Sequence, residues 1–153
     1  MRIKRCCVFI VAITLTFGLV ALFSGCLALQ KKPLFEYLGE DALQFADDFR
    51  RDGALSLTVR YDTEASGEPY TTRDEQTILA AFNAMDNMTV ISDGGTGHTD
   101  DYLVYTFELH DGSFHYFTFQ RGHYMTDRME LIGITGFDDL IAAFPPQSPE
   151  FRT

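Results

Sequence analysis

The first clear pattern in the chain is an apolar stripe with helical spacing between residues 33 and 51. Side chains that recur at intervals of three, four and one lie on one face of an α-helix. The members of this stripe are Phe35, Leu38, Ala42, Phe45, Ala46 and Phe49. We therefore expect a helix from Pro33 to about Arg51, weakened at Gly39 and regular from Glu40. Gly53, just beyond its end, suits a helix stop.

Residues 54–61 alternate between apolar and polar side chains, which is typical of a strand with one wet face. The apolar positions are Leu55, Leu57, Val59 and Tyr61. A loop then leads to Thr72-Arg73-Asp74-Glu75, which has the form of a capping box with Thr72 as the N-cap and Glu75 reaching back to it. We expect a second helix from here to Asp86-Asn87, with its buried face formed by Ile78, Leu79, Phe82 and Met85.

A short strand over residues 88–92 and a Gly/Asp-rich connection over 93–101 precede a predicted hairpin. Segments 102–110 and 113–120 are rich in aromatic and β-branched residues and are separated by Asp111-Gly112. Asp-Gly favours a two-residue type I′ turn. That turn would pair Glu108 with His115. One face of the hairpin would then carry Leu103, Tyr105, Phe107, Leu109, Phe114 and Tyr116, and the other face Tyr102, Val104, Phe117 and Phe119.

The remaining pattern predicts turns at Arg121-Gly122 and Asp127-Arg128, a last strand over residues 129–135, and a short closing helix. That helix has one apolar stripe, and Pro145-Pro146 stops it because proline supplies no backbone N–H. Its apolar members are Phe137, Leu140, Ile141 and Phe144. Because the strands cluster in sequence and do not alternate with helices, the predicted fold class is α+β, an antiparallel β-meander with amphipathic helices packed on it.

The amino terminus has a different character from the rest of the chain. Three of the first five residues are basic, and residues 6–23 carry no charge. Such a stretch partitions into a bilayer while its basic flank stays on the cytoplasmic side. The uncharged run is also long enough to remain as an uncleaved anchor helix.

The sequence Leu22-Phe23-Ser24-Gly25-Cys26 at the end of this segment resembles the lipobox of bacterial membrane lipoproteins, with Phe23 in place of the usual leucine. The resemblance implies cleavage after Gly25, a diacylglycerol on the Cys26 sulfur and an N-acyl group such as palmitate on the new amino terminus. In general appearance the chain is similar to the small lipoproteins of Gram-positive bacteria. No motif assigns the rest of the chain to a family.

This interpretation divides the chain into four parts. Residues 1–25 are a lipoprotein signal peptide, 26–33 a membrane tether, 34–146 a single α+β domain and 147–153 a flexible tail. Removal of the signal leaves Cys26 as the only cysteine, so no internal disulfide is expected. It also leaves nine basic against 22 acidic residues, a net charge of −13. Such an acidic chain repels phosphate backbones, so nucleic acid is not an expected partner.

No residue pattern identifies a catalytic site. The four histidines lie in or beside the predicted meander, among several aspartates, and imidazole with carboxylate can bind a divalent metal. Their spacing matches no metal motif, and the weak candidates are His98, Asp100, His115 and His123. We therefore expect no metal and no cofactor beyond the covalent lipid of Cys26. A small divalent-metal-dependent envelope hydrolase using these residues remains the alternative function.

The aromatic residues of the predicted hairpin are the main non-catalytic feature. Tyrosine at a surface suits recognition because it offers contact area at a low entropic cost. Tyr102 and Tyr124 are the candidates for such a contact, with burial in the core as the competing interpretation. The first hypothesis is a non-enzymatic binding module, held on the extracytoplasmic side of the cell membrane by lipid on Cys26. Its partner would be an envelope protein or ligand that the sequence does not identify.

Overall fold

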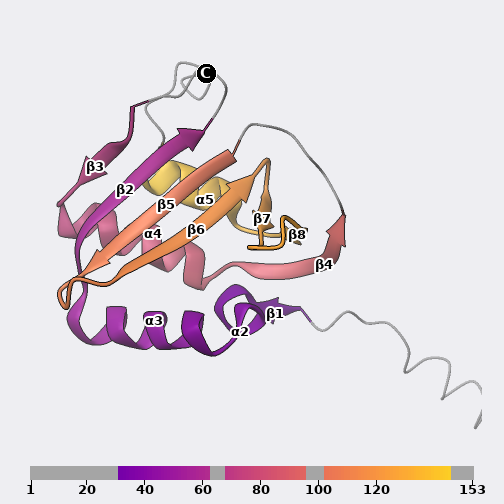
Figure 1. The fold of residues 1–153 in the computed structure, drawn as a ribbon, viewed down its shortest axis with the longest axis horizontal. Coiled ribbons are helices and arrows are strands. Elements are labelled where there is room, and N and C mark those ends of the chain that lie inside the picture. The colour runs from indigo at the N-terminus through magenta and orange to yellow at the C-terminus, as the bar shows by residue number, and fades with distance from the viewer. Residues whose placement is uncertain (1–30, 63–67, 96–101, 146–153) are drawn as a thin grey trace, which may run out of the picture. The chain divides into compact units, whose positions relative to one another are not determined.

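The computed structural model describes residues 31–62, 68–95 and 102–145. These residues form one eight-stranded antiparallel sheet in the order β1-β4-β8-β7-β6-β5-β2-β3 (Figure 1). The strands are β1 Lys32–Pro33, β2 Ala54–Asp62, β3 Tyr70–Thr72, β4 Thr89–Gly95, β5 Tyr102–Leu109, β6 Phe114–Gln120, β7 His123–Met125 and β8 Leu131–Ile134. The helices in these ranges are α2 Leu34–Leu38, α3 Glu40–Asp52, α4 Glu75–Asp86 and α5 Phe137–Ala143. The predicted α+β class with an antiparallel meander is confirmed.

Four segments lie outside the described residues: 1–30, 63–67, 96–101 and 146–153. They include Cys26, His98, Asp100 and the expected signal peptide and tail. Lys32–Pro33, which the sequence pattern assigned to the membrane tether, forms strand β1 and pairs with Val90 and Thr89 of β4. The folded domain therefore begins before residue 34.

The helices supply one side of a single hydrophobic core, and one face of the sheet supplies the other. Figure 1 shows α4 and α5 behind the central strands and α3 along their lower edge. The core is unusually aromatic: Phe45 of α3 has its ring centroid 5.3 Å from that of Phe107 and 5.1 Å from that of Phe117. Phe49 stacks on Phe82 of α4 at 3.9 Å. We call the sheet face that meets these rings the inner face, and the opposite one the outer face.

The apolar stripe of residues 33–51 faces the core as predicted, and the helix is interrupted where the glycine weakens it. Gly39 has a φ of +97°, ends α2 and precedes α3. The break lets Phe35 of α2 and Phe45 of α3 both pack against Phe117. Glycine tolerates this backbone conformation, which L side chains rarely adopt.

The start of α4 differs from the predicted capping box. Asp74, and not Thr72, is the N-cap, and its carboxylate accepts hydrogen bonds from the Thr77 backbone N–H at 2.8 Å and the Thr77 hydroxyl at 2.7 Å. The Thr72 hydroxyl instead accepts the Asp74 N–H at 3.1 Å. A carboxylate is an efficient N-cap because it also complements the positive helix end. Leu79, expected on the buried face, is 51% exposed.

Strand β2 follows the predicted alternation only after its first residues. A register shift separates the pairs Ala54–Leu109 and Ser56–Glu108, so Leu55 is an extra residue on β2. This bulge leaves Leu55 42% exposed and buries Ser56, whose hydroxyl donates to the Glu108 carboxylate at 2.7 Å. Beyond the bulge, Leu57 and Val59 face the core as expected.

The β5–β6 hairpin exists, but its predicted register is wrong by one residue. The loop contains three residues, His110, Asp111 and Gly112, because Leu109 N–H donates to Ser113 O at 3.0 Å. The Gly112 N–H also donates to Leu109 O, and Gly112 takes a φ of +84°. This is a type I turn followed by a left-handed glycine, the usual three-residue hairpin loop.

The extra loop residue moves one strand of the hairpin to the opposite face. Phe107 pairs with His115 and Glu108 with Phe114, so the predicted Glu108–His115 pair does not form. Side chains alternate along a strand, so a shift of one position reverses every assignment on β6. Phe117 and Phe119 therefore lie in the core, whereas the outer-face residues Phe114 and Tyr116 are 52% and 63% exposed.

The C-terminal part follows its pattern closely. Arg121 and Gly122 have φ values of +46° and +79° and form the two-residue turn between β6 and β7. Leu140 and Phe144 are buried, as the stripe of the closing helix predicts. The buried Tyr105 hydroxyl donates to the Phe144 carbonyl at 2.9 Å, which ties the end of α5 to the central strand.

Candidate ligand-binding site

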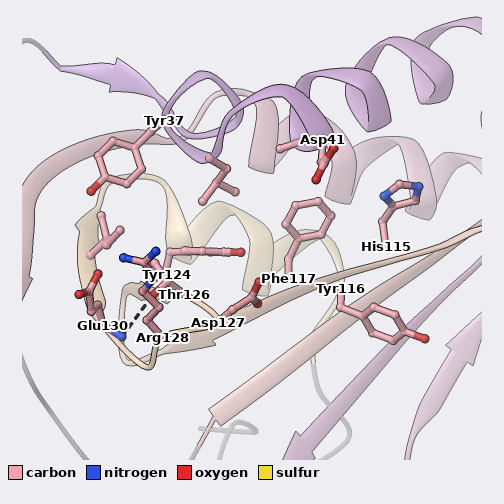
Figure 2. A pocket seen from close by; sticks show the side chains of 13 residues that line it. Tyr37, Asp41, His115, Tyr116, Phe117, Tyr124, Thr126, Asp127, Arg128 and Glu130 are labelled. Atoms are coloured by element: carbon pink, nitrogen blue, oxygen red, sulfur yellow. Dashed lines mark hydrogen bonds between the residues drawn. The ribbon is translucent and has the colours of Figure 1, made fainter.

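A hollow of about 510 Å³ opens on the inner face, beside the amino-terminal end of α3. Figure 2 shows its lining side chains converging from α2 and α3 on one side and from β6, β7 and the β7–β8 loop on the other. It forms where α3 covers Phe117 but does not extend over β7 and β8. Aromatic, acidic and basic side chains all contribute to its lining.

The floor of the hollow is apolar. Leu38 and Ala42 contribute from the helices, and Phe117 and Ile132 from the sheet. These residues belong to the hydrophobic core or pack against it. An apolar floor on rigid elements gives a ligand a fixed surface from which water is readily displaced.

Tyr124 is the polar group within this floor. Its side chain is 8% exposed, and its ring meets the Phe119 ring edge-on at 5.6 Å. Within the described residues the structure shows no hydrogen bond from the Tyr124 hydroxyl, and this oxygen reaches the hollow that the residue lines. Burial and the nearby Asp127 carboxylate raise the pKa of Tyr124 to about 12, so the phenol is neutral and able to donate or accept a hydrogen bond.

Charged side chains form the rim. Asp41 comes from the first turn of α3, and Asp127, Arg128 and Glu130 come from the β7–β8 loop (Figure 2). All four are exposed. None of the three carboxylates takes part in the ion pairs found among the described residues. The rim therefore carries three negative side chains against one positive side chain, that of Arg128.

The β7–β8 loop has the same three-residue design as the β5–β6 loop. Thr126 N–H donates to Glu130 O at 3.0 Å and Met129 N–H to Thr126 O at 2.8 Å. Met129 occupies the left-handed position with a φ of +60°, where the β5–β6 loop has Gly112. A non-glycine residue pays a conformational cost there, and such strain is often found at functional sites. The loop places Asp127 and Arg128 at the mouth of the hollow.

The candidate site residues of the sequence analysis do not come together as one site. Of the two tyrosine candidates for a surface contact, Tyr124 has its ring turned toward the core by β7, which agrees with the competing interpretation of burial. Tyr102 is partly buried at the start of β5 and does not line the hollow. His115 does line it, with its ring 4.8 Å from that of Phe45 and its Nε2 3.3 Å from Ser113 Oγ.

The two metal-candidate histidines that the structure describes, His115 and His123, are too far apart to share a metal. His123 pairs with Gln120 on the outer face, five positions along β6 from His115, which faces inward. At about 3.3 Å per residue this separates them by roughly 16 Å. No group of three His, Cys, Asp or Glu side chains in residues 31–62, 68–95 and 102–145 is arranged to hold a metal ion.

Ser113 and His115 do not form an activated nucleophile. Their contact of 3.3 Å is long for a serine–imidazole pair, and the Asp111 carboxylate accepts the Ser113 N–H and does not orient the imidazole. The hydrogen bond from Ser113 holds the pKa of Asp111 below its usual value. These contacts stabilise the hairpin loop.

Most residues of the hollow carry no signal of a site in the sequence. Asp41 falls within the predicted first helix, and Asp127-Arg128 is predicted only as a turn. The one available signal is the non-glycine residue at position 129, directly after a predicted turn. That signal becomes visible only once the loop length is known.

Comparison with known proteins finds no matching family model, no matching curated protein and no matching solved structure. None of the helices described by the structure is long and apolar enough to span a membrane.

Proposed function

We propose that this chain is a lipid-anchored extracytoplasmic protein whose domain binds a small ligand in the hollow beside α3, without catalysing a reaction. The observation that carries the binding role is the hollow itself, which combines an apolar floor with a charged rim. Its volume of about 510 Å³ lies within the range of small-molecule sites, about 300–1,000 Å³. The anchor rests on the lipobox that ends in Cys26.

Two features support binding over core packing as the role of these residues. The floor is built on α3 and on the paired strands β6, β7 and β8, which hold its shape without a ligand. Tyr124 places a hydroxyl in an otherwise apolar floor, where it is accessible from the hollow. A ligand polar group at this point would find a hydrogen-bond partner held in a fixed position.

The lipid anchor is tested on the native protein. Purification from membranes and intact-mass spectrometry should show a chain that begins at Cys26 and carries acyl groups. Cys26→Ala should accumulate an unacylated precursor. A native protein that retains residues 1–25 and has no acyl mass would contradict the anchor while leaving the binding role open.

The binding role is tested by blocking the hollow. Full-length protein in phosphatidylcholine nanodiscs is screened against a fragment library by ligand-observed NMR, with empty discs as the blank. Ala42→Phe inserts a ring into the floor and should abolish the specific hits. Ala80→Phe, on the exposed side of α4, is the matched control and should retain them.

Thermal unfolding establishes that both variants fold. Should Ala42→Phe not fold, Asp41→Trp blocks the exposed rim instead, where the larger side chain is accommodated without strain. Hits that survive both blocking variants, or the absence of any hit above the empty discs, would contradict a binding role for this hollow.

A further inference from the structure

We infer that the hollow recognises a small organic ammonium ion, with its apolar part on the floor and its cationic nitrogen near Tyr124 and Asp127. This inference rests on the proposed binding function and specifies the chemical class of the ligand. It depends on two independent observations: the charge of the rim and the position of the Tyr124 hydroxyl.

The first observation is the unbalanced charge. Asp41, Asp127 and Glu130 face the hollow together with a single arginine, Arg128. The domain as a whole is also strongly acidic, so its field attracts cations and repels anions. An anionic ligand would have to approach against this field, whereas a cation gains from it both on approach and when bound.

The second observation is the side chain of Tyr124, which is more than nine-tenths buried. Figure 2 shows its hydroxyl directed into the hollow, toward the side where Asp127 lies. The Asp127 carboxylate raises the pKa of Tyr124, which agrees with its position near the hydroxyl. A phenol oxygen and a carboxylate on one side of an apolar floor supply the acceptors that an ammonium N–H requires.

Aromatic rings complete the complementarity to a cation. Phe117 and Tyr37 border the hollow, and the negative face of an aromatic ring attracts an ammonium group. The same rings bury the hydrocarbon body of such a ligand. A metal ion fits less well, because no three ligating side chains converge here in the described part of the chain.

Three probes that share a phenol body and differ in charge test the inference. They are tyramine, its neutral analogue tyrosol and the anion 4-hydroxyphenylacetate. Isothermal titration calorimetry of the full-length protein in phosphatidylcholine nanodiscs, with empty discs as the blank, should show tyramine binding roughly tenfold more tightly than tyrosol. The anion should bind most weakly. Added salt should weaken tyramine binding but leave tyrosol unaffected.

Matched variants locate the interaction. Asp127→Asn and Tyr124→Phe should each weaken tyramine by about three- to tenfold, and Asp127→Asn should leave tyrosol unchanged. Asp138→Asn removes the same charge from the exposed first turn of α5, outside the hollow, and should change nothing.

The outcomes separate the two proposals. Equal affinity for all three probes, or equal effects of Asp127→Asn and Asp138→Asn, would overturn the ammonium inference while preserving a binding hollow. Failure of tyramine to bind, when the fragment screen yields hits that Ala42→Phe abolishes, would also overturn only the inference. Failure of every probe and every fragment would overturn both.

Discussion

On the inner face of the β5–β6 hairpin, Tyr105, Phe107 and Phe119 are fully buried, whereas Phe114 and Tyr116 on the outer face are 52% and 63% exposed. The two sets come from the same strands and have the same chemical character. They differ in what lies opposite them: the inner rings meet α3 and the residues of α5 and its end, whereas on the outer face Tyr116 pairs with Thr106 and Phe114 with Glu108. Aromatic content alone therefore does not distinguish core from surface here. The loop that sets the register does.

Among the substitutions that test this difference between the two faces, Phe107→Ala should have the largest effect on stability. The Phe107 ring lies 5.3 Å from Phe45 and 5.7 Å from Phe49, so its removal leaves a cavity among rings that cannot close it. We expect a loss of about 3–5 kcal/mol in the free energy of unfolding. Urea titration followed by circular dichroism measures it. A loss below about 1 kcal/mol would mean that the inner face is not a packed core.

The fate of the individual predictions shows which sequence signals suffice. The stripe of residues 33–51 correctly predicts that Phe45 and Phe49 are buried. Helical spacing is local, so it shows by itself which side chains share one face of the helix. The faces of β6 were assigned wrongly, because they depend on whether the Asp-Gly loop has two residues or three. Both loops are compatible with Asp111-Gly112, and only the packing of Phe117 against α3 decides between them.

The candidate site was less predictable than the fold. The residues that line it include Asp41, Phe117, Tyr124 and Asp127. They lie far apart in sequence and share no motif. Their proximity follows from the strand order, which places β7 and β8 on the side of β6 away from β5. No local pattern encodes that arrangement. The sequence leaves open whether the Tyr124 ring lies at the surface or in the core, because the register of β7 does not follow from it.

The buried tyrosines of the inner face should make the stability of the protein depend on pH. The pKa of Tyr124 is raised to about 12 by burial and by Asp127, and burial also raises that of Tyr105. An unfolded tyrosine ionises near pH 10. The unfolded state therefore loses protons first, and the stability from these phenols is complete below about pH 10 and is lost as the pH rises toward 12.

For Tyr124 this amounts to about 2–3 kcal/mol between pH 9 and pH 12. Urea titrations across that range should show the decline, and Tyr124→Phe should make it shallower. A wild-type stability that stays flat to pH 12 would indicate that Tyr124 is solvated like an exposed phenol.

The loop that fixes the register should respond to a change in backbone preference alone. Gly112 has a φ of +84° and no atom within 4 Å of the position that a Cβ would occupy. Gly112→Val should therefore cost about 1–2 kcal/mol through strain and not through a clash. The opposite change in the matching loop, Met129→Gly, should stabilise the protein by about 1 kcal/mol. Thermal unfolding measures both. Two changes of the same sign would contradict the equivalence of the two loops.

The smallest expected effect completes the comparison of the two faces. Phe114→Ala removes the same side-chain atoms as Phe107→Ala from the same hairpin, but from its outer face. About half of that ring is in water in the folded state, and its loss leaves no cavity. The expected cost is below about 1 kcal/mol, mainly from the weaker strand preference of alanine. Measured beside Phe107→Ala under identical conditions, a difference of several kcal/mol would fix the register as the structure has it. Similar losses in the free energy of unfolding for the two variants would mean that the outer face is covered in solution. The assignment of Phe114 to the surface would then be wrong.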